Sequence, residues 1–117
     1  MPAIIKFYDR LRLKYFMDAE PPMHTPPPAT ELQFVWTKPE APLLGKTTFD
    51  EEGDPYLIEL NPTFAVYAIV RETLLHEMTH MRLYPQSFAS CGAKGIAPSR
   101  LWIEEAVRLA RLGAVIL

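Results

Sequence analysis

The sequence predicts a single α+β domain, residues 1–117, built from three helices and a small three-stranded sheet, antiparallel or mixed. Apolar residues recur at helical spacing near both ends of the chain and in one long central run, and three short β-prone runs precede that central run. Hydrophobic residues make up 49% of the chain, which is enough for one modest core and too much for a disordered protein. We therefore expect an N-terminal helix, a long central helix and a C-terminal, glutamate-bearing helix around one core.

The first helix is expected over residues 3–17, because positions 4, 7, 8, 11 and 15 are apolar and charges lie between them. We interpret it as a packing helix. The stripe is short and its polar face includes Asp9, which disfavours the alternative of an amphipathic membrane anchor. The next segment, residues 19–31, holds two proline clusters and is expected to form an extended loop.

The three β-prone runs are residues 32–37, 43–49 and 56–60. A polar turn over residues 50–54 connects the second run to the third. We expect an antiparallel meander, in which each strand pairs with the next one along the chain. Gly45, within the second run, predicts a bulge or the close approach of another segment.

The central helix is expected to begin at Asn61, an N-cap residue followed by a proline at the first helical position. It should run through Tyr84 and stop at Pro85, a length of roughly 22 residues or ~33 Å. Such a helix would span the domain. Residues 85–98 contain prolines and glycines and are expected to form an irregular connection.

The last helix is expected to follow Ser99 as its N-cap, with Glu104 and Arg108 spaced for an ion pair one turn apart. Gly113 should loosen its end. The apolar residues 114–117 are then expected to pack against the core.

The stretch that points most directly to a function is His76-Glu77-Met78-Thr79-His80, within the central helix. Two histidines four residues apart lie on one helix face, near enough to share a metal ion, and neutral imidazole suits Zn²⁺. Glu77 lies beside the pair, where it can take a proton from water at the metal. We therefore expect a Zn²⁺ site with His76 and His80 as ligands and Glu77 as the catalytic residue.

A third protein ligand is expected, and the candidates are Glu105, Glu104, Cys91 and His24. Glu105 falls at the edge of the apolar arc of the last helix, where a carboxylate is costly to bury unless it is paired or binds a metal. Glu104 falls on the polar face. Cys91 by default is a small buried residue, and His24 is a loop histidine. We favour Glu105 and keep the other three as alternates.

Charge and composition argue against several classes of protein. The net charge of −2 and the lack of a basic block argue against direct nucleic-acid binding. No run approaches ~18 apolar residues, so no membrane span is expected. The single cysteine and the lack of a signal-like N-terminus favour a cytoplasmic protein, although a secreted protein without disulfides stays an alternative. The sequence does not address the oligomeric state.

The chain resembles two groups of zinc proteases. His76-Glu77-x-x-His80, followed by the segment Trp102 to Ala106, resembles the gluzincin metallopeptidases, whose minimal members, the minigluzincins, are single domains of about this size. A second similarity, to SprT-like zinc proteases, covers about residues 30–114. It rests on the segments Phe34-Val35-Trp36, Leu44-Gly45-Lys46-Thr47, Ile58-Glu59-Leu60-Asn61, Thr73 to His80 and Arg108 to Ala114. SprT-like proteins usually supply a third histidine in an H-G pair, and the nearest equivalent here is Lys94-Gly95, so that ligand is missing.

These resemblances imply a zincin architecture and a zinc-dependent metallopeptidase that acts on peptide or protein substrates. In so small a domain the cleft should be shallow, and the proline-rich loop or the C-terminal tail could occupy it, so we expect low or latent activity. Glu105 would be the third ligand and Glu77 the general base. The strand over residues 56–60 would form the rim that pairs with an extended substrate, and Tyr84 would contact the substrate or transition state unless it only packs. Two alternatives stay open. One is a zinc-binding regulatory module, SprT-like and associated with DNA through a partner, with little or no proteolysis. The other is an accessory protein whose zinc is purely structural.

Overall fold

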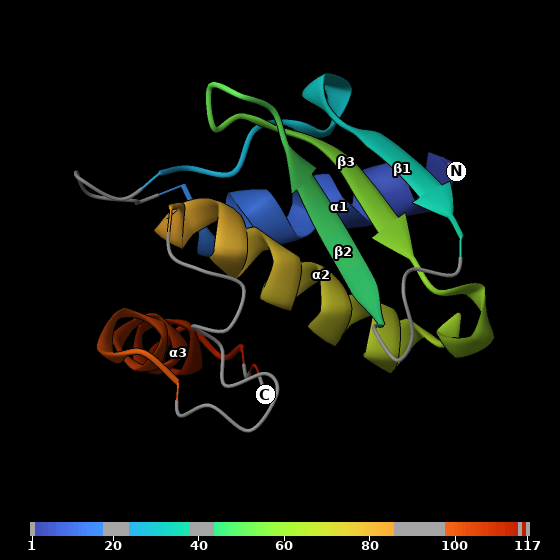
Figure 1. Cartoon of the computed structure of the whole chain (residues 1–117). Helices are drawn as coiled ribbons and strands as arrows, with labels where there is room; N and C mark the ends of the chain where they lie inside the picture. The colour runs from blue at the N-terminus through green and yellow to red at the C-terminus, as the bar shows by residue number, and fades with distance from the viewer. Residues whose placement is uncertain (1, 18–23, 38–43, 86–97, 115, 117) are drawn as a thin grey trace.

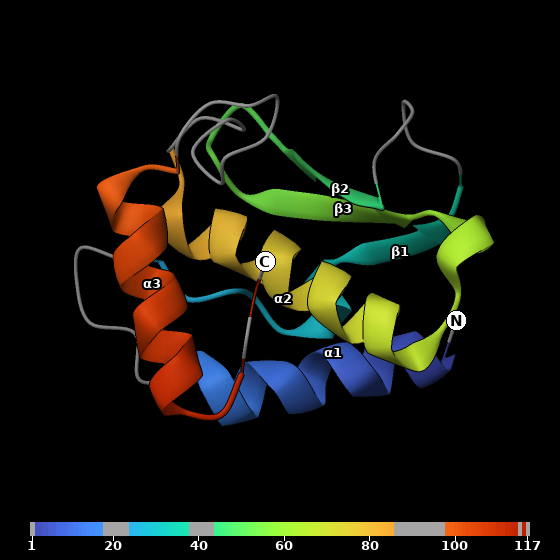
Figure 2. The same ribbon diagram turned by 90° about the horizontal axis from the view of Figure 1, so that it is seen from below.

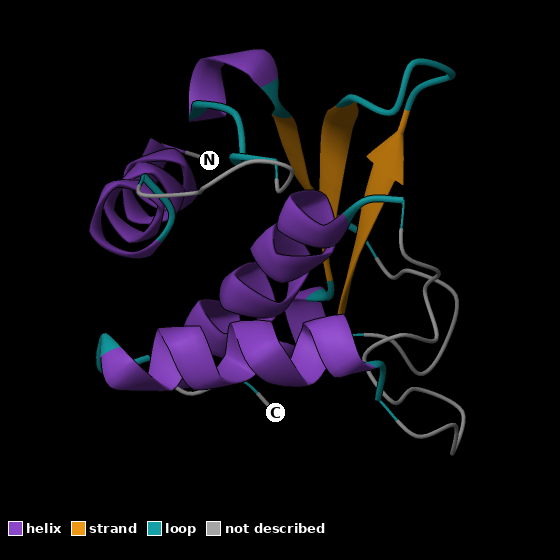
Figure 3. Ribbon diagram, turned by 90° about the vertical axis from the view of Figure 1, so that its left-hand side faces the viewer, coloured by secondary structure: helices purple, strands orange, loops and turns teal. Residues whose placement is uncertain are grey.

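A central helix, α2 (Tyr67–Leu83), lies between the N-terminal helix α1 (Pro2–Tyr15) on one side and a three-stranded sheet on the other (Figures 2 and 3). The third helix, α3 (Arg100–Arg111), crosses the C-terminal half of α2. This computed structural model describes residues 2–17, 24–37, 44–85, 98–114 and 116. Within them, it confirms the predicted α+β class, with three α-helices and a small mixed sheet.

The sheet consists of β1 (Gln33–Trp36), β2 (Gly45–Phe49) and β3 (Pro55–Leu60), in the order β1-β3-β2 (Figure 1). β1 is parallel to β3, and β2 is antiparallel to β3 through a hairpin whose turn contains Gly53 at φ 87°. The predicted meander is therefore wrong, because β1 does not pair with β2. β3 takes the central position, with β1 on one side and β2 on the other, and it buries Ile58 and Leu60.

This strand order also corrects the predicted rim. The strand over residues 56–60 has a neighbour on each side, so it has no open edge for a substrate. β2 is an edge strand instead, and among the described residues β3 is the one strand that pairs with it.

The prediction of the first helix is confirmed, since α1 buries Phe7, Tyr8, Leu11 and Tyr15 on one face. The predicted start of the central helix is wrong. Asn61 does cap a turn, with its side chain accepting a hydrogen bond from the Thr63 amide at 3.0 Å, but that turn is a short 3₁₀ segment, Pro62–Phe64.

The α-helix itself begins after Val66, which is extended, and has 17 residues rather than about 22. Every residue from Pro62 to Ala68 is exposed, so no apolar face is buried there to extend the helix toward Asn61. Its end agrees with the prediction, because Leu83 is the last helical residue and Pro85 follows closely.

The start of α3 is also as predicted, with the Ser99 hydroxyl accepting a hydrogen bond from the Trp102 amide at 3.1 Å. The predicted pair of Glu104 with Arg108 does not form. Glu104 pairs with Arg100 at 2.9 Å in solvent, and Arg108 turns to Glu105, which lies on the buried side. Arg108 therefore partly neutralises a buried carboxylate rather than an exposed one.

The end of α3 turns at Gly113, which has φ 93°, and the Ala114 amide donates to the Leu109 carbonyl at 2.9 Å. Ala114 and Ile116 are buried, so the apolar tail packs at these two residues as predicted. The predicted irregular connection falls largely on residues 86–97, outside the described part. None of the helices in the described part is long and apolar enough to cross a membrane.

Candidate functional site

His76 and His80 lie one turn apart on α2, and their Nε2 atoms are 3.2 Å apart. Both side chains are partly buried. Two nitrogens that bind one Zn²⁺ at about 2.0–2.1 Å in tetrahedral geometry lie about 3.3 Å apart. The observed distance therefore fits two ligands of one ion. Without an ion it also fits an N–H···N bond in which one ring carries the proton on Nε2.

Burial, with a smaller contribution from the charge of His76, lowers the pKa of His80 to about 4. The imidazole of His80 is therefore neutral at neutral pH, because the low-dielectric surroundings disfavour its charged form. A neutral imidazole has a free lone pair for a metal ion. His80 therefore need not lose its second ring proton before it could bind a metal ion.

Trp102 of α3 packs against both histidine rings, with ring centroids 5.0 Å from His76 and 4.8 Å from His80. Its indole is buried at the crossing of α2 and α3. The sequence pattern included Trp102 only as a neighbour of the glutamates, and its contact with the histidines was not predicted. A large aromatic ring there holds the imidazoles in place and excludes water from one side of them.

Glu77 is buried, with 6% of its surface exposed, and Thr47 of β2 donates a hydrogen bond from its hydroxyl to Oε1 at 2.8 Å. Burial raises the pKa of Glu77 to about 7, and hydrogen bonds from the side chain and backbone of Thr47 oppose this rise. A carboxyl group with a pKa near neutrality accepts and returns a proton readily at physiological pH. The predicted role of Glu77 as the general base stays a prediction, and this pKa is compatible with it.

Sequence reasoning missed Thr47. Alternation along a strand places residues 45 and 47 on one face, and the predicted close approach at Gly45 is confirmed on that face. A Cβ at Gly45 would lie 2.6 Å from the Cγ2 atom of Thr73 on α2. Strand alternation and the glycine were the signals that could have indicated Thr47. The sequence did not show, however, that β2 packs against α2.

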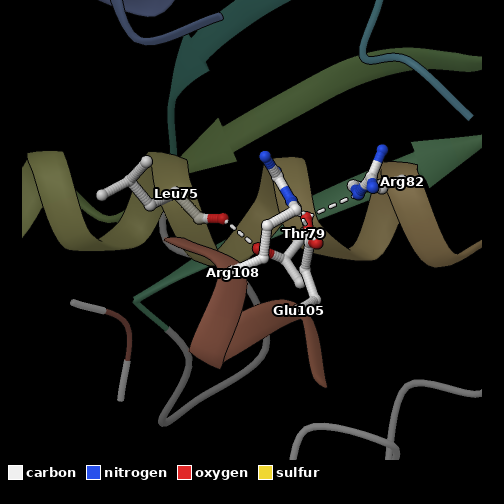
Figure 4. Close-up of polar contacts among 5 residues, drawn as sticks. All are labelled: Leu75, Thr79, Arg82, Glu105 and Arg108. Carbon is white, nitrogen blue, oxygen red and sulfur yellow. Dashed lines mark hydrogen bonds and ion pairs between the residues drawn. The ribbon is translucent and has the colours of Figure 1, made fainter. Parts of the chain in front are cut away.

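Glu105 lies at the junction of α2 and α3, between two arginines (Figure 4). Its Oε2 atom is 2.7 Å from Nε of Arg82, and Arg108 binds both of its oxygens, at 2.6 Å and 2.8 Å. Only 4% of Glu105 is exposed. The buried carboxylate is therefore compensated by guanidinium groups in this structure.

The structure does not bring Glu105 together with the two histidines in one metal-binding group. Among the described residues, no cluster of three or more His, Cys, Asp or Glu side chains is arranged to hold a metal ion. The predicted role of Glu105 as third ligand stays a prediction, and to fill it the carboxylate would have to leave at least part of its contact with Arg82 and Arg108.

The remaining candidates lie elsewhere. Glu104 is exposed and bound to Arg100, and Cys91 falls outside the described residues. His24 is exposed, with its ring 6.3 Å from that of Tyr84. Tyr84 stacks on Phe49 at 4.7 Å, beside the hairpin turn, so the structure gives its ring a packing role.

Comparison with known proteins gives no significant match to a family profile, a curated protein or a solved structure.

Proposed function

We propose that this protein is a zinc-dependent metallopeptidase. The observation that carries the proposal is the approach of two imidazole Nε2 atoms to 3.2 Å on α2, next to a buried glutamate. His76 and His80 would hold the ion. When bound, Zn²⁺ supplies Lewis acidity, which makes water more acidic and polarises a peptide carbonyl.

The chain's own groups would handle the protons. Glu77 would accept a proton from the attacking water and pass it to the leaving amine. The Thr47 hydroxyl donates a hydrogen bond to Oε1 of Glu77, and the proton would be carried on Oε2. The pKa near 7 lets the same carboxyl act first as a base and then as an acid.

The edge strand β2 is the proposed place for the substrate. It carries Thr47, which contacts Glu77, and its outer edge is where an extended peptide can add backbone hydrogen bonds. A peptide on that edge would run beside the proposed base. This assignment replaces the central strand β3, which has neighbours on both sides.

The proposal is tested with zinc analysis and peptide cleavage on the purified protein. We expect stoichiometric zinc after dialysis in the wild type and in Glu77→Gln, and loss of zinc in His76→Ala and His80→Ala. Cleavage of a mixed library of quenched fluorescent peptides should fall at least ~100-fold in Glu77→Gln, as expected when a general base is removed. Glu72→Gln, a partly buried glutamate on the same helix, is the control and should behave as the wild type.

The outcomes separate the proposal from its alternatives. A wild-type protein without zinc would refute it. Zinc without cleavage would favour a non-proteolytic zinc-binding module, and cleavage that persists in Glu77→Gln would exclude Glu77 as the base.

A further inference from the structure

β2 runs beside α2, and two residues on one face of the strand meet two successive turns of the helix. Gly45 lies against Thr73, and Thr47 lies against Glu77, four residues further along α2. Two residues along a strand advance about 6.6–6.8 Å, and four residues along a helix advance about 6 Å, so the two steps nearly match. Beyond the end of α2, Phe49 stacks on Tyr84.

Gly45 allows this close approach. A Cβ there would come within 2.6 Å of Cγ2 of Thr73 and 3.2 Å of the Glu59 carbonyl oxygen. Thr73 has little freedom to move away, because it is buried and its hydroxyl donates to the Ile69 carbonyl at 2.7 Å. The missing side chain thus lets β2 lie near enough to α2 for the hydroxyl of Thr47 to reach Glu77.

The bond from Thr47 is directional. An ionised carboxylate accepts and cannot donate, so the hydroxyl of Thr47 must be the donor to Oε1. Glu77 is 6% exposed, so water has little access to replace a lost donor. The bond therefore fixes the orientation of the carboxylate as well as satisfying one of its oxygens.

We infer that Thr47 is a positioning residue for the general base, because its hydroxyl, brought close by Gly45, holds Oε1 of Glu77 and so sets the orientation of the carboxylate for proton transfer. The inference rests on the proposed peptidase function. Thr47 acts through Glu77 and need not touch the substrate. Its hydroxyl, rather than its size, is the essential feature.

Three variants separate the hydroxyl from its surroundings. Thr47→Val keeps the shape and removes the donor, whereas Thr47→Ser keeps the donor and removes a methyl group. Thr48→Val is the matched control, since neighbouring strand residues point to opposite faces. We expect kcat to fall about tenfold or more in Thr47→Val, with KM within about twofold and zinc content unchanged, because one hydrogen bond corresponds to roughly that factor. Thr47→Ser should stay within about threefold of the wild type, and Thr48→Val should be unchanged.

A second measurement needs no activity. In the metal-free protein, Thr47→Val should raise the equilibrium constant for unfolding about tenfold or more when Glu77 is present. In a Glu77→Ala background the same substitution should raise it less than about threefold.

The results would overturn the inference if Thr47→Val kept the wild-type kcat, if Thr47→Ser were as slow as Thr47→Val, or if the stability effect were the same with and without Glu77. Failure of the proposed function looks different. In that case the wild type would cleave no peptide, while the stability experiment would still show or exclude the contact between Thr47 and Glu77.

Discussion

Replacing Glu105 by glutamine removes one negative charge from a buried cluster and leaves the volume of the side chain almost unchanged. In the wild type, one carboxylate lies against two guanidinium groups, those of Arg82 and Arg108. Glutamine would leave both cations without a countercharge at this junction. The variant therefore measures how far the packing of α3 on α2 depends on that charge.

The expected loss is large because the cluster is shielded from water. The side chains of Arg82 and Glu105 are only 7% and 4% exposed, so solvent screens their interaction little. Nε and Nη1 of Arg82 are buried without a hydrogen-bond partner among the described residues, and Nε depends on its close ion pair with Glu105. Removing one member of a buried ion pair typically costs about 3–5 kcal/mol, a large part of the ~5–15 kcal/mol that stabilises a domain.

The assay is urea unfolding of the metal-free protein, followed by circular dichroism. Glu104→Gln is the control on the neighbouring residue. Its partner Arg100 is 91% exposed, and such a pair contributes little. We expect Glu105→Gln to lose about 3–5 kcal/mol and Glu104→Gln less than about 0.5 kcal/mol. Equal losses in the two variants would refute the reasoning.

Metal content in an arginine variant then decides whether Glu105 is also a ligand. If the carboxylate must leave Arg82 to bind zinc, Arg82→Met should raise zinc affinity, because it removes a competitor. If Glu105 only holds α3 in place, the same variant should lower zinc affinity or leave it unchanged. An increase in zinc affinity in Arg82→Met would therefore support the ligand role and exclude the purely structural one. Zinc loss in Glu105→Gln, by contrast, would fit both roles.

Two further predictions concern α2 and its neighbours. Gly45→Ala should destabilise the protein by about 1–3 kcal/mol through overpacking against Thr73. In a Thr73→Ser background, which lacks the clashing methyl group, the cost should be clearly smaller in urea unfolding, and an equal cost would show that the clash is not the cause. For Glu77, a pKa raised from 4.5 to about 7 means that the folded protein holds a proton that the unfolded chain releases, so stability falls as pH rises through this range. Metal-free Glu77→Gln should therefore match the wild type near pH 4, below the unfolded pKa, and exceed it by up to about 3 kcal/mol at pH 8. A difference independent of pH would contradict the shift.

Local patterns were sufficient for most of the secondary structure. The apolar spacing over residues 3–17 predicted α1, and Ser99 predicted the start of α3. The errors arose where the outcome depended on distant segments. Asn61 and Pro62 carry a helix-start signal, but whether a helix continues from such a start depends on whether its next turn is buried, and residues 62–68 are exposed.

The sheet shows the same limit. Each strand was recognisable, but the order β1-β3-β2 depends on how the strands pack against the rest of the chain, which no local pattern reports. For the site, the spacing of His76 and His80 is a local property of a helix and was predictable. The hydrogen bond of Thr47 to Glu77 joins residues 30 positions apart, and no local pattern reports it.

Glu105 shows why periodicity predicts burial better than role. Its position on the last helix indicated a buried carboxylate, which needs a positive partner, and both a metal ion and an arginine meet that need. The arginines now explain the burial, yet they also connect Glu105 to the site. Trp102 lies one turn before Glu105 on α3 and contacts both histidines. The ion pair of Glu105 with Arg82 and the ring contact of Trp102 therefore hold neighbouring turns of α3 against α2. A tryptophan and a glutamate three residues apart can therefore be needed for the geometry of the histidine pair whether or not the glutamate ever touches the ion.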